Sequence, residues 1–270
     1  IGWCGFGVFR LFWRVFDGFA LWGKGDNNFS SCRRNYLCFY LLIIWCCYYI
    51  KTVLKRCVKG IMIILIGSQK GGCGKSTTAV NICAELARSG HDVVLVDADR
   101  QCTAANWISD RLSKTQVAKV HCVQKYENIR ETLLDLNQRY GFVVVDAAGR
   151  DSRELRTGMT AAHVLLIPFR PSQPDLDTLP KLREIISQAM DLNPQLKVFG
   201  LLTMAPTNPV INEEAEAREY LQDYPEIHLL NTFVRDRKVY RDAMSEGLGV
   251  VEMDNPKAKN EIEELVKEII

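Results

Sequence analysis

The sequence predicts an α/β fold in which a doubly wound, mainly parallel sheet is covered by helices on both faces. Apolar runs of strand length alternate with helical patterns from Met62 to the end of the chain. A glycine-rich segment joins the first apolar run to the first helical pattern, and aspartates close two of the later runs. Strands that alternate with helices are joined by right-handed crossovers, which make neighbouring strands parallel.

Each expected strand is an apolar run rich in β-branched residues, which is typical of a strand buried on both faces. The strands are expected at 62–67, 92–99, 142–149, 163–169, 197–204 and 228–234. Between these runs, apolar residues recur at helical spacing. The helices are expected at 75–90, 101–112, 127–139, 173–191, 211–222, 236–246 and 256–269, the first of them ending at Gly90, a residue type favoured there.

The composition changes sharply at Met62. Residues 1–61 carry 9 Lys/Arg and 2 Asp/Glu, a net charge of +7, whereas residues 62–270 carry 25 and 30, a net charge of −5. The apolar run Tyr36–Ile50 is 15 residues long, short of the roughly 20 that span a bilayer. No methionine precedes Met62. We therefore expect residues 1–61 to be upstream sequence translated in frame, with a hydrophobic membrane anchor or a small folded appendage as alternatives, and residues 62–270 to form one domain.

The segment KGGCGKS, residues 70–76, joins a predicted strand to a predicted helix. Its glycines allow the backbone N–H groups to turn inward around a phosphate, and the helix N-terminus adds partial positive charge. Lys75 can reach the β- and γ-phosphates of a nucleotide, and the Ser76 hydroxyl can bind Mg²⁺. The strict pattern GxxxxGK[ST] is not met, because Gln69 stands where its first glycine would be and an additional lysine, Lys70, follows.

The segment resembles the deviant P-loop (Walker A) of the ParA/MinD class of ATPases, and the resemblance to that class extends over residues 62–270. It implies a P-loop NTPase fold, ATP and Mg²⁺ as cofactors, and a dimer around two ATP molecules. Lys75 would then bind its own ATP, and Lys70 would reach across the dimer interface to stabilise phosphate charge on the partner's ATP. The nucleotide-binding residues implied are Lys70, Gly71, Gly72, Cys73, Gly74, Lys75, Ser76 and Thr77.

Two carboxylate motifs extend this resemblance. VLVDADRQ, residues 94–101, is similar to the family's second motif but has Arg100 where proline is typical. The resemblance implies that Asp99 positions or activates the attacking water and that Asp97 lies near the Mg²⁺ shell. VVVDAAGR, residues 143–150, is similar to the Walker B strand, so that Asp146 would hold Mg²⁺ through water and Gly149 would lie in a loop that senses the γ-phosphate. The structural alternative for each aspartate is a helix N-cap.

The stretch IPFRPSQPDLDTL, residues 167–179, is similar to the corresponding stretch of ParA-type partition ATPases, especially the short ParF-like plasmid proteins. This resemblance implies an ATPase in the bacterial cytoplasm, associated with the nucleoid. Its ATP-bound dimer would bind DNA without sequence preference, and a centromere-binding adaptor of the ParB or ParG kind would stimulate hydrolysis. Plasmid or chromosomal DNA would be partitioned by this cycle.

Contact with DNA would need a local basic patch, because residues 62–270 are acidic overall. The candidates are Arg235, Arg237, Lys238 and Arg241, which could equally form a solvated face balanced by Asp236 and Asp242. A second group (Arg150, Arg153 and Arg156) follows the Walker B strand and could instead serve the dimer interface.

The sequence is also compatible with two other functions. One is a MinD-like positioning ATPase that works on a membrane. The last helical segment has acidic residues on its polar face, which anionic lipids repel, so we expect its apolar stripe (Ile262, Leu265, Val266 and Ile269) to pack on the domain. The other is a metabolic enzyme on the same scaffold, such as a relative of the carboxylate-amine ligases. The cysteines after Met62 lack metal-ligand spacing, which argues against an iron–sulfur protein.

Overall fold

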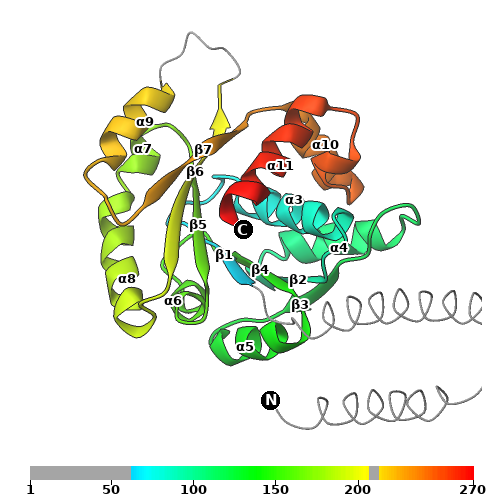
Figure 1. Cartoon of the computed structure of the whole chain (residues 1–270), viewed down its shortest axis with the longest axis horizontal. Helices are drawn as coiled ribbons and strands as arrows, with labels where there is room; N and C mark the ends of the chain where they lie inside the picture. The colour runs from blue at the N-terminus through cyan, green and yellow to red at the C-terminus, as the bar shows by residue number, and fades with distance from the viewer. Residues whose placement is uncertain (1–61, 207–212) are drawn as a thin grey trace, which may run out of the picture. The chain divides into compact units, whose positions relative to one another are not determined.

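The computed structural model describes residues 62–206 and 213–270, which form a seven-stranded parallel sheet (Figure 1). The expectations for residues 1–61 lie outside the described residues. The strand order is β3-β2-β4-β1-β5-β6-β7. The strands are β1 (Met62–Ile66), β2 (Val93–Ala98), β3 (His121–Gln124), β4 (Phe142–Ala147), β5 (Val164–Phe169), β6 (Lys197–Ala205) and β7 (His228–Arg235).

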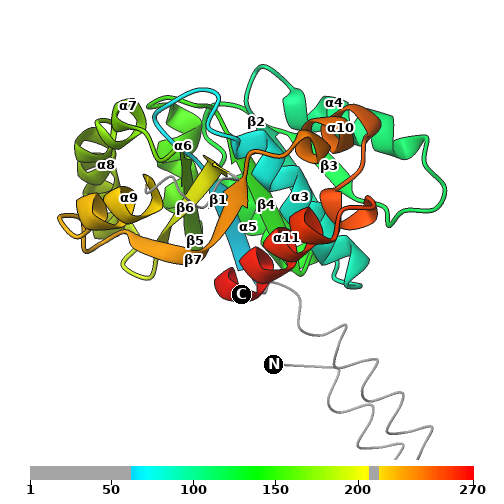
Figure 2. The ribbon, with the colours of Figure 1, turned by 90° about the horizontal axis from the view of Figure 1, so that it is seen from above.

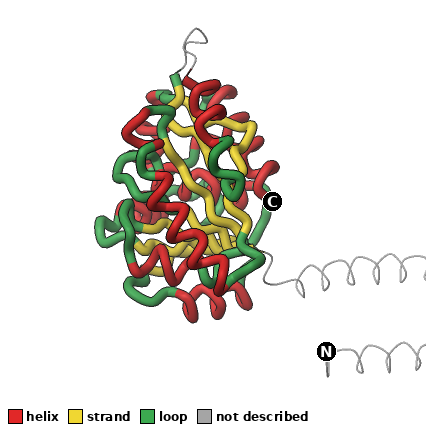
Figure 3. Tube along the Cα trace, turned by 90° about the vertical axis from the view of Figure 1, so that its left-hand side faces the viewer, coloured by secondary structure: helices red, strands yellow, loops and turns green. Residues whose placement is uncertain are grey.

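Helices cover both faces of the sheet, as Figures 2 and 3 show. One face carries α3 (Lys75–Arg88), α4 (Thr103–Leu112), α10 (Lys238–Glu246), the 3₁₀ turn η1 (Val250–Glu252) and α11 (Pro256–Ile269). The other carries α5 (Arg130–Arg139), α6 (Arg153–Met159), α7 (Gln173–Leu176), α8 (Leu179–Leu192) and α9 (Glu213–Leu221). The predicted doubly wound α/β fold is confirmed.

The central strand β1 shows why its sequence is a continuous apolar run. Ile63 and Leu65 belong to the core under α5, α6 and α8, whereas Ile64 and Ile66 belong to the core under α3, α4 and α11. All four side chains are fully buried. Because successive side chains of a strand point to opposite faces, a strand between two helical layers must be apolar at every position.

The chain leaves β1 and β4 toward opposite faces of the sheet. These two strands are neighbours, but α3, which follows β1, and α6, which follows β4, lie in different layers. Adjacent parallel strands whose connections diverge in this way leave a crevice at their carboxyl ends, where ligands bind in open α/β sheets. The fold therefore places the loops after β1 and β4 at its natural binding position.

Three elements differ from the sequence prediction. The edge strand β3 was not predicted, because its four residues have exposed polar ends and no apolar run. The short arginine-rich helix α6 was also missed; it begins where the Ser152 side chain accepts a hydrogen bond from Leu155 N. The helix expected at 173–191 is divided into α7 and α8, since Pro180 in the first turn of α8 could not extend an unbroken helix from α7 without clashing with a carbonyl.

A buried ion pair joins α4 to η1. The Arg111 guanidinium donates two hydrogen bonds to the Glu252 carboxylate, of 2.7 and 2.8 Å, and its side chain is 3% exposed. Trp107, on the same helix, donates from Nε1 to Leu248 O at 3.0 Å. A bidentate, desolvated pair of this kind is costly to break, so α4 is held rigidly to its neighbours.

The terminal helix α11 packs on the domain as predicted, with its apolar stripe buried against the α3 side of the sheet. Within the part of the chain that the structure describes, no helix combines the length and the apolar character needed to cross a membrane.

Candidate nucleotide-binding site

The phosphate-binding loop lies between β1 and α3, at the carboxyl edge of the sheet. Gly72 and Gly74 have φ values of +74° and +83°, a backbone conformation that side chains with a Cβ rarely adopt. Gly74 stands immediately before α3, so the first N–H groups of that helix face the loop. The sequence therefore uses glycine where the backbone must wrap around an anion.

Lys75 is 93% buried inside this loop, with only 7% of its surface exposed. Its Nζ donates to the backbone oxygen of Lys70 at 2.9 Å and lies 3.9 Å from Cys73 Sγ. The loop after β4 packs on the same place, since a Cβ added to Gly149 would lie 2.5 Å from Lys75 Nζ and 2.8 Å from Lys70 O. The P-loop lysine and the Walker B glycine are thus brought together.

Asp97 and Asp146 lie side by side at the ends of β2 and β4, as partners in the sheet register. Both side chains are fully buried. Asp97 accepts hydrogen bonds from two backbone groups, Asp99 N at 3.1 Å and Ala105 N at 2.8 Å. Ala105 is in the first turn of α4, so Asp97 satisfies one of the N–H groups that a helix leaves without a partner there. The N-cap alternative raised from the sequence is close to its observed role.

Asp99, two residues further on, is half-buried in the loop between β2 and α4. Its Oδ1 accepts a hydrogen bond from Gln101 N at 3.0 Å, which closes a turn at the start of this loop. Asp97 therefore stabilises the loop between β2 and α4 through its backbone N–H groups, and Asp99 lies within that loop. Arg100, at the position where proline is typical of the family motif, pairs with Glu127 at 3.1 Å instead of shaping the turn.

Asp146 differs from Asp97 because neither of its oxygens accepts a hydrogen bond from the described residues. The pKa of this carboxyl is raised to about 7, chiefly by burial and in addition by the neighbouring Asp97 and Asp99 carboxylates. The Ser76 hydroxyl and the Lys75 ammonium group act in the opposite direction. These mutual influences show that the residues predicted for the site, from the loops after β1, β2 and β4, occupy one small region.

The chemistry of this region fits a magnesium ion. Mg²⁺ binds oxygen ligands, keeps several waters and is usually held by one or two carboxylates together with substrate phosphates. Asp146 offers a buried carboxylate with unused acceptor capacity, and Ser76 offers a hydroxyl close to it. Asp97 contributes less capacity, since both its oxygens already accept backbone hydrogen bonds. No group of three or more His, Cys, Asp or Glu side chains in 62–206 and 213–270 is arranged as a protein-only metal site.

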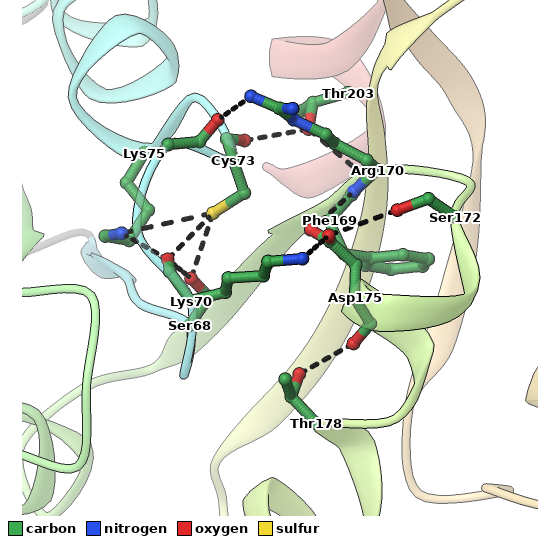
Figure 4. A network of polar contacts seen from close by, with 11 residues as sticks. Ser68, Lys70, Cys73, Lys75, Phe169, Arg170, Ser172, Asp175, Thr178 and Thr203 are labelled. Atoms are coloured by element: carbon green, nitrogen blue, oxygen red, sulfur yellow. Dashed lines mark hydrogen bonds and ion pairs between the residues drawn. The ribbon is translucent and has the colours of Figure 1, made fainter.

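A second set of contacts, which was not predicted, ties the phosphate loop to the segment after β5 (Figure 4). Lys70 Nζ forms an ion pair with Asp175 Oδ2 at 2.6 Å, and Arg170 donates to Gly72 O at 2.5 Å. The buried Thr203 hydroxyl lies 2.8 Å from Cys73 O and 3.2 Å from Phe169 O. Asp175 belongs to the stretch that resembles the partition ATPases, but the sequence alone gave it no role.

A cavity of about 240 Å³ opens beside the N-terminus of α3. Its walls include Gly74 and Thr77 from the start of α3, Met204 from β6 and Tyr240 from α10, with Asp236 and Arg237 at the end of β7. The cavity adjoins the phosphate loop and presents both apolar and polar side chains. A mixed lining of this kind beside a phosphate loop makes the cavity a candidate site for the remainder of a nucleotide.

A family model described as the CobQ/CobB/MinD/ParA nucleotide binding domain matches residues 64–250. The chain belongs to this family. A carboxysome distribution protein, the maintenance protein A of Halothiobacillus neapolitanus, is 33% identical over 211 residues, which cover 77% of this chain and 95% of that protein. The deviant Walker A assignment and the ParA-class relationship are thereby confirmed.

Solved structures of ParA/MinD-family proteins have the same fold. A Borrelia burgdorferi plasmid partition protein bound to AMPPNP gives a TM-score of 0.59 at 19% identity, and covers 78% of this chain and 100% of that chain. The Pyrococcus horikoshii septum site-determining protein MinD, complexed with Mg-ADP, gives 0.60 at 17% identity, and covers 77% and 96%.

The basic residues considered for DNA binding lie near the cavity of this ParA/MinD-family domain. Arg235, Arg237 and Arg241 line it. Ion pairs join Arg237 to Glu261 at 2.7 Å, Lys238 to Asp242 at 2.9 Å and Arg241 to Asp236 at 2.8 Å. Arg235 donates to Pro206 O at 2.5 Å. The solvated-face alternative therefore has structural support, and the DNA-binding role of this patch stays a prediction.

Proposed function

We propose that this ParA/MinD-family protein is a Mg²⁺-dependent ATPase that dimerises around two ATP molecules and positions a cargo by binding DNA. The observation that carries the proposal is the buried Asp146 carboxylate, without a hydrogen-bond partner among the described residues, beside a phosphate loop with two lysines. A buried charge without a structural partner is costly, and a bound cation is the simplest compensation.

The residues take the following roles in the proposed reaction. Ser76 and Asp146 would hold Mg²⁺, which would neutralise phosphate charge when bound. Lys75 exchanges its hydrogen bond with Lys70 O for phosphate oxygens, since an ammonium group binds an anion more strongly than a carbonyl. Asp99 orients the attacking water from its loop after β2. Asp97 keeps that loop in place through Asp99 N and Ala105 N.

Lys70 acts on the nucleotide of the partner subunit. Its side chain is 39% exposed, and its Nζ lies on the opposite side of the loop backbone from that of Lys75 (Figure 4). Two nucleotides between facing subunits bring many negative charges together, and a lysine from each side reduces their repulsion. Dimerisation then depends on ATP, and the added charge stabilises the transition state as an arginine finger does.

The cargo we propose is plasmid or chromosomal DNA in a bacterial cytoplasm, with the ATP-bound dimer on the nucleoid and a centromere-binding adaptor that stimulates hydrolysis. Curated relatives named for chromosome partitioning support this reading. A second candidate cargo is a protein compartment, because the relative that is 33% identical over 95% of its own length is named for carboxysome distribution. A membrane cargo is less favoured, since the apolar stripe of α11 is buried in the domain.

Binding of the full chain to double-stranded DNA of arbitrary sequence tests this proposal. It should be measured with ATP, with ADP and without nucleotide, across a salt series. We expect binding only with ATP, with an affinity that falls steeply as salt rises, because phosphate contacts release counterions. Hydrolysis without DNA binding in any nucleotide state would contradict the DNA-based mechanism while leaving the ATPase. The absence of Mg²⁺-dependent hydrolysis would contradict the ATPase itself.

A further inference from the structure

The Asp175 carboxylate is the most heavily engaged acidic group near the phosphate loop. Its side chain is 3% exposed. Oδ2 lies 2.6 Å from Lys70 Nζ and accepts a hydrogen bond from Ser172 Oγ at 3.1 Å, and Oδ1 accepts one from Arg170 N at 3.2 Å. This carboxylate therefore has one charged partner, Lys70, and two neutral ones.

We propose that Asp175 is a positioning residue that holds Lys70 against its own subunit and thereby sets the protein concentration at which ATP drives dimerisation. The inference rests on the proposed function, because it requires Lys70 to act on the partner's nucleotide. Asp175 would then control the balance between two positions of Lys70, one within its own subunit and one across the dimer interface.

The Asp175 carboxylate and the phosphates of the partner's nucleotide compete for the ammonium group of Lys70. In this proposal Lys70 Nζ leaves its position 2.6 Å from Asp175 to contact phosphates bound by another subunit. When it leaves, the carboxylate stays buried and keeps only the Ser172 hydroxyl and the Arg170 amide. A buried charge that loses its counter-charge is destabilised. This cost opposes dimerisation. A higher protein concentration is therefore needed for half of the chains to be dimeric than would be needed without the Lys70–Asp175 ion pair.

The phosphate loop itself does not depend on this ion pair. Arg170 contacts Gly72 O through its guanidinium, and Thr203 contacts Cys73 O through its hydroxyl. Neither contact uses the Asp175 carboxylate. The cradle for the subunit's own nucleotide therefore remains in place when Lys70 departs, which separates an effect on dimerisation from an effect on nucleotide binding.

The substitution Asp175→Asn tests the inference with little change of shape. The amide oxygen can still accept from Arg170 N, and the amide nitrogen can donate to Ser172 Oγ, but the counter-charge for Lys70 is gone. The matched control is Asp177→Asn, at the end of the same short helix, where the carboxylate accepts from Gln173 Nε2 and does not contact Lys70. The full chain and both variants should be studied by sedimentation across protein concentrations with ATP and with AMPPNP, and their ADP affinity measured by calorimetry.

We expect Asp175→Asn to lower the midpoint of dimerisation, the protein concentration at which half of the chains are dimeric, about tenfold, which corresponds to about 1.4 kcal/mol. ADP affinity should stay within about twofold, and Asp177→Asn should match the unmodified chain. A second variant, Ser172→Ala, removes one neutral donor from the carboxylate, so that Asp175 holds Lys70 more strongly. It should shift the midpoint in the opposite direction, by about threefold, and it keeps the inference testable if Asp175→Asn fails to fold.

The outcomes are distinguishable. Dimers in the unmodified chain, with an unchanged or raised midpoint in Asp175→Asn, would overturn this inference alone; a raised midpoint would show that Asp175 supports Lys70 within the dimer. A midpoint that is unchanged in Ser172→Ala would likewise count against it. If the unmodified chain forms no ATP-dependent dimer, the proposed function fails, and this inference fails with it.

Discussion

Asp97 and Asp146 are register partners at the ends of adjacent strands, and both are fully buried, yet their surroundings differ. Asp97 accepts two backbone hydrogen bonds and organises the loop before α4. Asp146 accepts none from the described residues, and burial raises its pKa to about 7. The same residue type at the same level of the sheet is thus satisfied by the fold in one strand and left without a partner among the described residues in the next, where we propose that it binds Mg²⁺.

The difference shows how to separate structure from function at a buried carboxylate. A carboxylate whose oxygens are satisfied by the fold contributes to stability, and its removal should weaken the fold. A carboxylate that the fold leaves without partners lowers stability, and a bound ligand would compensate for that cost. Three predictions test this contrast, and a fourth tests the contact of the loop after β4 with the phosphate loop.

The largest effect is expected for hydrolysis in Asp146→Asn. The amide cannot supply the negative charge that Mg²⁺ requires, so the rate at saturating ATP should fall at least about 100-fold. Steady-state phosphate release with a magnesium titration measures this. The control is Asp135→Asn on α5, whose exposed carboxylate pairs with Arg139 and is outside the candidate site; this variant should leave the rate unchanged. A rate reduced less than tenfold would remove Asp146 from the magnesium site.

The second prediction concerns pH. The folded pKa of Asp146, about 7, lies above its ordinary value of 3.8. Between these values the unfolded chain releases the proton and the folded chain keeps it, so stability falls as pH rises. Above about pH 7 the full penalty of about 4 kcal/mol persists. Asp146→Asn removes this penalty, although the unmet hydrogen bonds of its amide reduce the gain to about 2 kcal/mol.

Urea unfolding without nucleotide or Mg²⁺ measures that gain. The variant should be more stable than the unmodified chain at pH 7.5, and this advantage should be lost near pH 3, where Asp146 is largely protonated in both the folded and the unfolded chain. A gain of the same size at both pH values would show that the cause is not ionisation of Asp146.

The third prediction has the opposite sign. Asp97→Asn keeps one acceptor oxygen but loses the hydrogen bond from either Asp99 N or Ala105 N, which costs about 1–2 kcal/mol. Burial raises the pKa of Asp97 as well, so removal of its charge offsets part of this cost, and the free energy of unfolding should fall by about 1 kcal/mol. Urea unfolding at pH 7.5 measures this change and compares it with that of Asp146→Asn under the same conditions. Stabilisation by both substitutions, or destabilisation by both, would remove the contrast between the two strands.

The smallest effect is expected where the loop after β4 meets the phosphate loop. In Gly149→Ala the new Cβ would lie too close to Lys75 Nζ and to Lys70 O, so one loop must move. Overpacking of this kind costs about 1 kcal/mol, and ADP affinity should fall about fivefold. Calorimetric titration with ADP would decide the matter, and an unchanged affinity would show that the two loops are not coupled in nucleotide binding.

Much of this site could be predicted from sequence because its chemistry is local. A strand, a glycine loop and a helix start follow one another within residues 62–88, and the aspartates stand directly at strand ends. The sheet then brings these segments together, since parallel strands have their carboxyl ends at one edge. The residues Lys75, Ser76 and Asp146 could therefore be placed together before any contact was known.

The parts that could not be predicted depend on contacts between distant segments. Lys70 and Asp175 are 105 residues apart, and no local pattern indicates that one holds the other. Asp97 and Asp146 look alike in sequence, and only the orientation of backbone N–H groups in the loop before α4 distinguishes them. Likewise, β3 has too little apolar character to be recognised without its partner strand β2.

The buried Arg111–Glu252 pair has a mechanical consequence for catalysis. It anchors α4, so the helix that follows Asp99 cannot swing as a lever when the nucleotide changes. Strand β2 is fixed in the sheet on the other side. Any displacement of Asp99 must therefore be absorbed by the short hinge at residues 98–102, which ends at Cys102 with a left-handed φ of 55°. Such a hinge permits small, abrupt adjustments of the carboxylate and excludes a large opening of this part of the domain.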